Sequence, residues 1–243
     1  MKPLVRWLLL AAAAFLLLQL FFVGRIALMV VVAPQSTAFQ RSEAFRIASQ
    51  THRLPWRQEW VPYEQIADNL KRAVIASEDD GFANHDGVDW EALEKAWQKN
   101  AKAEEQAARR AQLNPSRTPV PKIVGGSTIT QQLAKNLFLS GERTLLRKGQ
   151  EIVLTFALER ILSKERILEI YLNSVEWGEG VFGAEAAARH YYRKSAARLS
   201  AYEAARLAVM LPRPRYFEKL PNSGYLSSRA GVIVGRMPHA ELP

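Results

Sequence analysis

The chain has 243 residues, 48% of them hydrophobic, so it can form one sizeable domain with an appendage or two small domains around a buried core. Its net charge of +9 indicates an anionic partner such as nucleic acid, acidic lipid head groups or a phosphorylated substrate. Cysteine is absent, which excludes disulfides, thiolate metal sites and cysteine nucleophiles.

The first predicted element is an apolar helix near the N-terminus. Residues 7–23 carry no charge, and a bilayer core needs about 20 apolar residues as helix. Because Lys2 and Arg6 precede this segment, the positive-inside rule places the N-terminus in the cytoplasm. A cleaved signal peptide is the alternative, but the apolar segment is too long for one and lacks a clean cleavage site. We therefore expect residues 1–33 to be an uncleaved anchor, which favours lipid phosphate or cell-wall material over nucleic acid as the anionic partner.

The rest of the chain is predicted to be mainly helical. Residues 34–62 are expected to be irregular, with room for short strands, because Pro34, Pro55 and Pro62 break helices. Apolar spacing and capping residues then predict helices over 63–77, 90–113, 127–139, 145–162, 164–172, 184–192 and 201–211. The predicted caps include Ser127 or Thr128, Ser163, and a capping box of Ser200 with Glu203.

The helix predicted over 90–113 divides into two parts. Asp89 is a suitable N-cap, and Leu93, Ala96 and Trp97 have the spacing of a face that turns inward. The later part is charged and rich in alanine, so we expect it to be solvated.

The first stretch that indicates chemistry is ASEDDGFANHDG, residues 76–87. It places Glu78, Asp79 and Asp80 side by side, which fits either a solvated loop or a working carboxylate. Repulsion from two neighbouring acids would raise the proton affinity of Glu78, and this suits a general base near neutral pH. We expect His85 to make a hydrogen bond that stabilises the loop.

The second stretch is GGSTITQQLAKN, residues 125–136, a glycine-rich turn that opens a helix. Thr128, Gln131, Gln132 and Lys135 lie on one side of that helix by their spacing. Hydroxyls and a lysine at a helix N-terminus fit an anion site, and an ordinary N-capped amphipathic helix fits the spacing equally well. The Walker pattern GxxxxGK[ST] is absent.

The third stretch, ERTLLRKGQEIVLTFALER, places Glu151 four residues after Arg147 and three after Lys148. This is the spacing of salt bridges on a helix. The pair is either a surface ion pair or a carboxylate held among cations near a phosphate. No two histidines have ligand spacing, so a histidine metal site is not expected.

Together these motifs resemble, in order and spacing, those of the peptidoglycan glycosyltransferases, glycosyltransferase family 51. The matching residues, within about 60–217, are Glu78-Asp79-x-x-Phe82-x-x-His85-x-Gly87, Gly125-Gly126-Ser127-Thr128-Ile129-Thr130-Gln131-Gln132-Leu133-x-Lys135-Asn136, Arg147-Lys148-x-x-Glu151 and Arg166-Ile167-Leu168-Glu169-x-Tyr171-Leu172-Asn173. The single anchor without a transpeptidase region is similar to the family's monofunctional members.

The resemblance implies a mainly α fold: a lysozyme-like glycosyltransferase domain with a small jaw region, preceded by one N-terminal transmembrane helix. We therefore expect the anchor at 1–33, a linker or jaw region at 34–62 and the glycosyltransferase domain at 63–243. Two departures stand out. Residues 98–122 are longer and more charged than is usual in the family, and Arg193 stands where the family more often has glycine.

The resemblance also implies an activity, namely polymerisation of lipid II into glycan strands. A β-1,4 bond forms with inversion at the donor anomeric carbon, and undecaprenyl diphosphate is released from the growing glycan chain. Glu78 is then the general base, and Glu151 positions cations or the diphosphate. The predicted substrate contacts are Phe82, Ser127, Thr128, Gln131, Gln132, Lys135, Asn136, Arg143, Arg147 and Lys148.

Location and partners follow from the same resemblance. We expect the inner membrane, with the N-terminus cytoplasmic and the catalytic domain periplasmic, and penicillin-binding transpeptidases and division proteins as candidate partners. The diphosphate leaves room for a divalent cation, Mg²⁺ or Mn²⁺, and no other cofactor is expected. Two rival functions stay open: a lytic enzyme that cleaves the same glycan, and an anchored scaffold without activity.

Overall fold

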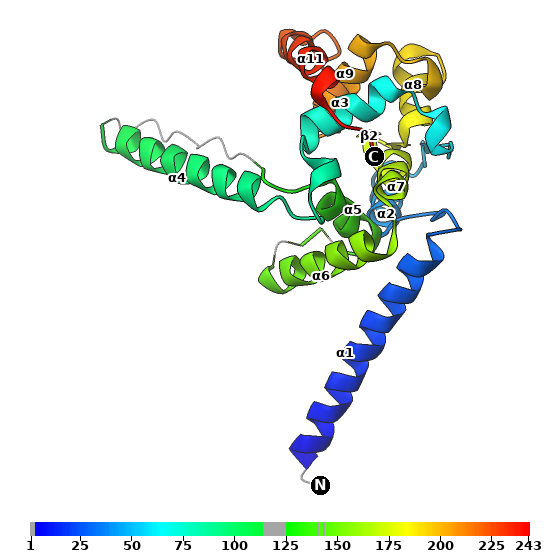
Figure 1. The fold of residues 1–243 in the computed structure, drawn as a ribbon, viewed down its shortest axis with the longest axis vertical. Helices are drawn as coiled ribbons and strands as arrows, with labels where there is room; N and C mark the ends of the chain where they lie inside the picture. Colours follow the sequence, from blue (N-terminus) through cyan, green and yellow to red (C-terminus); the bar gives the residue numbers. More distant parts are fainter. Residues whose placement is uncertain (1–2, 114–124, 140, 143) are drawn as a thin grey trace.

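The computed structural model describes residues 3–113, 125–139, 141–142 and 144–243. These residues form a mainly helical body, as predicted, from which one long helix extends (Figure 1). That helix is α1 (Pro3–Leu28). Among the described residues it is the one helix that is long and apolar enough to cross a membrane.

Helix α1 is fastened to the body near its C-terminal end. Gln19 and Gln150 of α6 (Leu145–Ile161) exchange side-chain hydrogen bonds of 3.2 and 2.9 Å. Further along, the Arg25 guanidinium lies 5.3 Å from the centre of the Phe138 ring. Ile26 at the end of the helix is fully buried. These contacts hold the C-terminal part of α1 against the body.

The prediction of irregular structure over 34–62 is wrong for half of that segment. Helix α2 spans Ala38–Thr51, and a capping box between Thr37 and Gln40 starts it. Its buried positions include Gln40 and Glu43 beside Ile47, so polar side chains occupy much of the inward face. An apolar pattern therefore does not mark this helix in the sequence.

The other predicted helices begin and end close to their predicted bounds, except that α3 begins at Asp68 and a separate 3₁₀ turn occupies Tyr63–Gln65. Ser163 caps α7 and Ser200 forms a capping box with Glu203 at the start of α9, both as predicted. The helices are α3 (Asp68–Glu78), α4 (Trp90–Leu113), α5 (Ile129–Phe138), α7 (Lys164–Ser174), α8 (Ala184–Tyr192) and α9 (Ala201–Met210). Two more, α10 (Pro214–Glu218) and α11 (Gly224–Arg236), follow; short 3₁₀ turns occupy Tyr63–Gln65, Phe82–Asn84, Ala196–Arg198 and Met237–His239.

A small sheet joins the segment after α2 to the middle of the chain. Its strands lie in the order β1 (Arg57–Gln58), β3 (Val181–Phe182), β2 (Glu176–Gly178), with β1 parallel and β2 antiparallel to β3. Gly180, in the turn between β2 and β3, has φ +71°, and a Cβ there would lie 1.9 Å from the Pro55 carbonyl oxygen. Only glycine lets the two backbones approach this closely.

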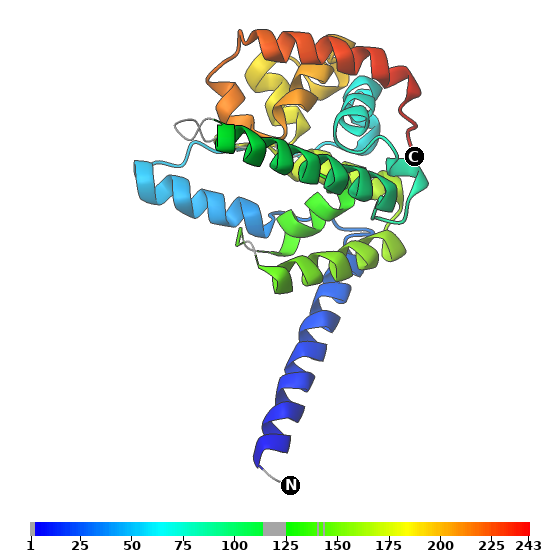
Figure 2. The same cartoon turned by 90° about the vertical axis from the view of Figure 1, so that its left-hand side faces the viewer.

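Helix α4 projects from the body (Figures 1 and 2), and this overturns part of its predicted orientation. Asp89 caps it, as expected, by accepting a 2.8 Å hydrogen bond from the Ala92 amide. Ala96 is buried, but Leu93 is 41% exposed and Trp97 is 74% exposed. The apolar spacing is real, yet the body covers only the edge of that face. Of the unusually long linker, the part beyond Leu113 up to residue 122 lies outside the described residues.

The Arg193 departure is accommodated without a change of turn. Arg193 adopts φ 56° and ψ 33° at the C-terminal end of α8, the left-handed conformation that glycine takes most easily. The chain therefore keeps the glycine geometry with a side chain that is strained in it.

Candidate active site

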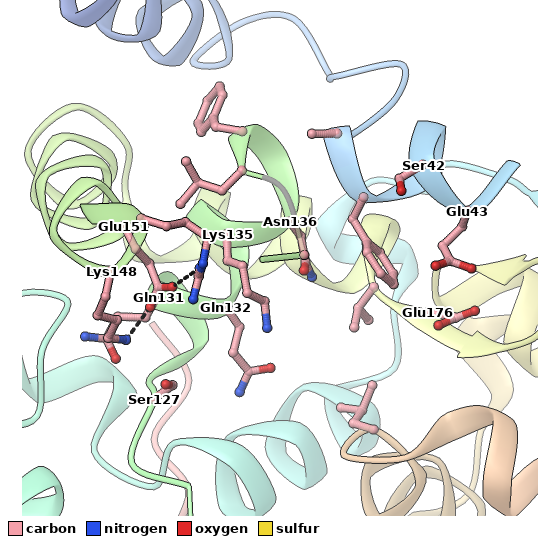
Figure 3. Close-up of a pocket in the computed structure, with 18 of the residues that line it drawn as sticks. Ser42, Glu43, Ser127, Gln131, Gln132, Lys135, Asn136, Lys148, Glu151 and Glu176 are labelled. Atoms are coloured by element: carbon pink, nitrogen blue, oxygen red, sulfur yellow. Dashed lines mark hydrogen bonds and ion pairs between the residues drawn. The ribbon is translucent and has the colours of Figure 1, made fainter. Parts of the chain in front are cut away.

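A cavity of about 680 Å³ opens between α2, α5, α6 and β2. Figure 3 shows Lys135 of α5 in its middle and Glu151 with Lys148 on one side. Glu43 and Glu176 lie together on the opposite side in the same view. Of the predicted site residues, the structure places these in the cavity wall: Ser127, Gln131, Gln132, Lys135, Asn136, Arg147, Lys148 and Glu151.

Glu78, the predicted base, ends α3 and is reached from the cavity through Gln132. The Gln132 side-chain amide donates a 3.0 Å hydrogen bond to Glu78 Oε2. Burial raises the pKa of Glu78, and the charge of Asp79 adds to the rise, whereas Gln132 and Lys135 counteract it. The Asp80 carboxylate is exposed and pairs with Arg236 at 3.1 Å, and its predicted effect on Glu78 stays a prediction.

Asp79 and His85 fix the loop that follows Glu78. The Gly87 amide donates to His85 Nδ1 at 3.1 Å, so the ring proton sits on Nε2, which donates to Asp79 Oδ1 at 2.8 Å. The second Asp79 oxygen accepts from the Ile129 amide at the start of α5. His85 therefore stabilises the loop, as predicted, and Asp79 ties that loop to the second motif.

The second motif forms an N-capped helix, and its N-cap hydroxyl, that of Thr128, is already hydrogen-bonded within the protein. Thr128 and Gln131 make a capping box at the start of α5. The Thr128 hydroxyl also donates a 2.6 Å hydrogen bond to the Gly87 carbonyl. Thr128 is buried and lies outside the cavity wall, where it has a structural role; its contact with substrate stays a prediction.

Phe82 does not reach the cavity either. Its side chain is fully buried beneath the loop, with the Lys164 ammonium 4.6 Å from the ring centre. The structure gives the Phe82 ring a packing role, and its contact with substrate stays a prediction. Arg143, another predicted substrate contact, lies outside the described residues.

Cations and one carboxylate form the cavity wall on α6. Glu151 has a side chain only 4% exposed and accepts from Arg147 at 2.9 Å and from Lys148. The predicted salt bridge is therefore confirmed, and it is more buried than a surface ion pair. Lys135 of α5 lines the same cavity, so three cationic side chains and one buried carboxylate stand on this side of it, which favours an anionic group there.

The opposite wall was missed in the sequence. Arg215 makes two hydrogen bonds to Glu176, at 2.8 and 3.0 Å, and also pairs with Glu43 of α2. These residues come from α2, β2 and α10, so no local spacing links them. Burial raises the pKa of Glu176, and Arg215 counteracts the rise. The cavity is thus lined by cations at one end and, at the other, by two carboxylates, Glu43 and Glu176, that both pair with Arg215.

The sequence model of the transglycosylase family matches residues 46–238. The chain belongs to this family. It is 52% identical to a biosynthetic peptidoglycan transglycosylase of Burkholderia thailandensis, over 100% of this chain and 90% of the relative. It is 50% identical to a protein of the same name from Herminiimonas arsenicoxydans, over 100% of this chain and 99% of the relative. The resemblance seen in the motifs is confirmed, and with it the mainly α, lysozyme-like fold class.

The charged groups of this transglycosylase domain do not fit a metal held by protein. Among the residues that the structure describes, no three of His, Asp or Glu gather closely enough to hold an ion. The one carboxylate on the cationic wall, Glu151, is already paired with Arg147 and Lys148. A divalent ion needs several oxygen ligands, and this wall offers it one.

Proposed function

We propose that this chain polymerises lipid II, with Glu78 as the general base and the α6 wall as the diphosphate site. Its family membership and its relatives make it a peptidoglycan glycosyltransferase of cell wall synthesis. The observation that carries the residue assignment is the Glu78 carboxylate beside a cavity whose facing wall is cationic.

In the proposed step, Glu78 takes the proton from the acceptor sugar hydroxyl as that oxygen attacks the donor anomeric carbon. The bond from this carbon to the diphosphate oxygen breaks, and the electron pair leaves with the diphosphate. A single displacement from the opposite face inverts the anomeric centre and forms the β-1,4 bond. Burial raises the pKa of Glu78 toward the working pH, which makes the carboxylate a better proton acceptor.

The leaving group needs charge stabilisation more than it needs an acid. Diphosphate leaves as an anion, so cations fixed in advance around it lower the barrier. Lys135, Arg147 and Lys148 supply these charges, and Glu151 holds Arg147 and Lys148 in place. Ser127, Gln131 and Asn136 complete that part of the wall as hydrogen-bonding groups. A Mg²⁺ or Mn²⁺ ion would enter with the substrate phosphates.

The membrane placement belongs to the same proposal. The apolar helix α1 supports a single-pass anchor, and we propose a cytoplasmic N-terminus and a periplasmic catalytic domain at the inner membrane. A polyprenyl substrate lies in that bilayer, so an anchored enzyme meets it by diffusion in two dimensions. Penicillin-binding transpeptidases and division proteins remain proposed partners.

The test uses detergent-purified protein and labelled lipid II, with products resolved on a gel. We expect glycan polymer from the wild type and none from Glu78→Gln. Shorter strands from a preformed glycan would instead indicate a lytic enzyme. Lipid II that binds without reacting in both proteins would indicate a scaffold. Equal polymer from both proteins would keep the enzyme and overturn the role of Glu78.

A further inference from the structure

We propose that Tyr171 is a positioning residue for the reaction, which holds the Gln132 amide with its N–H₂ group toward Glu78. The inference rests on the proposed function, since it assigns a part in setting the base. Tyr171 lies on α7, outside the cavity wall, and touches neither Glu78 nor the space for substrate in the described contacts.

Three helices meet in a chain of two hydrogen bonds. The Tyr171 hydroxyl donates to Gln132 Oε1 at 3.0 Å, and Gln132 Nε2 donates to Glu78 Oε2 at 3.0 Å. Tyr171 is fully buried, and this is the hydroxyl's one hydrogen bond among the described contacts. Gln132 sits between α3 and α7, so both faces of its amide are engaged at once.

The direction of the first bond decides the direction of the second. If the Gln132 amide turned over, its N–H₂ group would face Tyr171 and its oxygen would face Glu78. The Tyr171 proton would then lose its acceptor in a buried place, which is costly. An amide oxygen beside Glu78 would also repel the carboxylate and accept only from the protonated acid. Tyr171 therefore favours the orientation in which Gln132 stabilises ionised Glu78.

Among the groups around Glu78, Gln132 is the one that donates a hydrogen bond to its ionised carboxylate in the described contacts. Asp79 repels the Glu78 carboxylate, and its oxygens already serve His85 and the Ile129 amide. Lys135 attracts the carboxylate through space. Burial with the charge of Glu78 raises the pKa of Tyr171 well above its usual value, so its hydroxyl stays a donor at working pH.

The experiment measures kcat/KM for polymerisation against pH in the full-length protein. In Tyr171→Phe we expect the acid limb, where Glu78 ionises, to move up by about one pH unit, with about tenfold lower rate below it and recovery at high pH. Tyr191→Phe is the matched control, because its hydroxyl donates to the Trp177 carbonyl at 2.8 Å and serves no group near Glu78. Its acid limb should coincide with that of the wild type.

A different pH profile of Tyr171→Phe would overturn the inference. A Tyr171→Phe rate that falls by the same factor at every pH would assign Tyr171 to packing alone and overturn the inference. If Tyr171→Phe fails to fold by circular dichroism, Gln132→Met removes the same donor from Glu78 without touching α7. Its acid limb should move in the same direction, and an unmoved limb would overturn the inference.

Separate results test the proposed function itself. Absence of polymer from the wild type, or a normal rate in Glu78→Gln, would reject the role of Glu78 before any pH profile is compared. A working wild type and an inactive Glu78→Gln, with superimposable profiles for Tyr171→Phe and wild type, would reject only the inference.

Discussion

Glu151 offers the sharpest test of how the cationic wall is held together. Its carboxylate is almost wholly buried and accepts from Arg147 and Lys148 on its own helix. Replacement by glutamine keeps the size of the side chain and removes its charge. The two cations then face each other without the anion between them, so we expect Glu151→Gln to lower both the stability and the polymerisation rate.

The size of the stability loss follows from the exposure of the two partners. Breaking a buried pair by removing one member costs about 3–5 kcal/mol when the other charge stays buried. The Arg147 side chain is 17% exposed, and its Nε is buried without a partner among the described residues. Lys148 is 41% exposed, so its ammonium turns to solvent at little cost. We therefore expect the lower figure, about 3 kcal/mol.

Thermal unfolding in detergent, followed by circular dichroism, measures this loss. For a domain of this size 1 kcal/mol corresponds to about 2–4 °C in Tm, so the expected drop is about 6–12 °C. The double variant Glu151→Gln with Arg147→Gln removes both charges and should be more stable than Glu151→Gln alone. A drop of less than about 2 °C, or a double variant less stable than the single one, would refute the reasoning.

Three further predictions concern stability elsewhere in the fold. Burial raises the folded-state pKa of Glu78, so its contribution to stability is present below the unfolded value of about 4.3 and is lost as pH rises through the folded value. The Tm of Glu78→Gln should therefore rise relative to that of the wild type as the pH increases from about 4 to about 8, while its activity falls about 10²–10⁴-fold. A Tm difference between the two proteins that does not change with pH would contradict this. Gly180→Ala should lower Tm sharply or prevent folding, because its Cβ would meet the Pro55 carbonyl. Gly231→Ala on α11 has open space around the new Cβ and should raise the free energy of unfolding by up to about 1 kcal/mol. Equal effects in the two variants would count against the clash at Gly180. Arg193→Gly should stabilise by roughly 1 kcal/mol in urea unfolding because it relieves a left-handed backbone, and a loss of stability would show that the arginine side chain offsets this strain.

Local rules predicted much of the secondary structure. Asp89, Thr128, Ser163 and Ser200 start helices where their side chains suggest, because a cap acts on amides only two or three residues away. The spacing of Arg147 and Glu151 likewise predicted a salt bridge within one helix. The family resemblance identified the side of the cavity wall formed by α5 and α6, because those residues stand in contiguous motifs.

Other predictions failed where burial depends on distant elements. Periodicity marks an apolar face on α4 but not whether anything covers it, and Trp97 stays exposed. For Phe82 and Thr128, which match family motifs, the tertiary structure shows a packed ring and a capping hydroxyl, and their contacts with substrate stay predictions. Membership of a motif does not say whether a side chain faces substrate or the core.

The sequence by itself therefore determined the anchor helix, the mainly helical class, the capped helix starts and the candidate base, since each depends on neighbours along the chain or on one helix face. Tertiary structure alone decided which groups act on one another across the chain. It brought Glu43 and Glu176 together around the Arg215 guanidinium, and it placed the Tyr171 hydroxyl against the amide of Gln132. Hydrogen bonds and ion pairs form over about 3 Å, and only the packing of separate helices sets distances of that size.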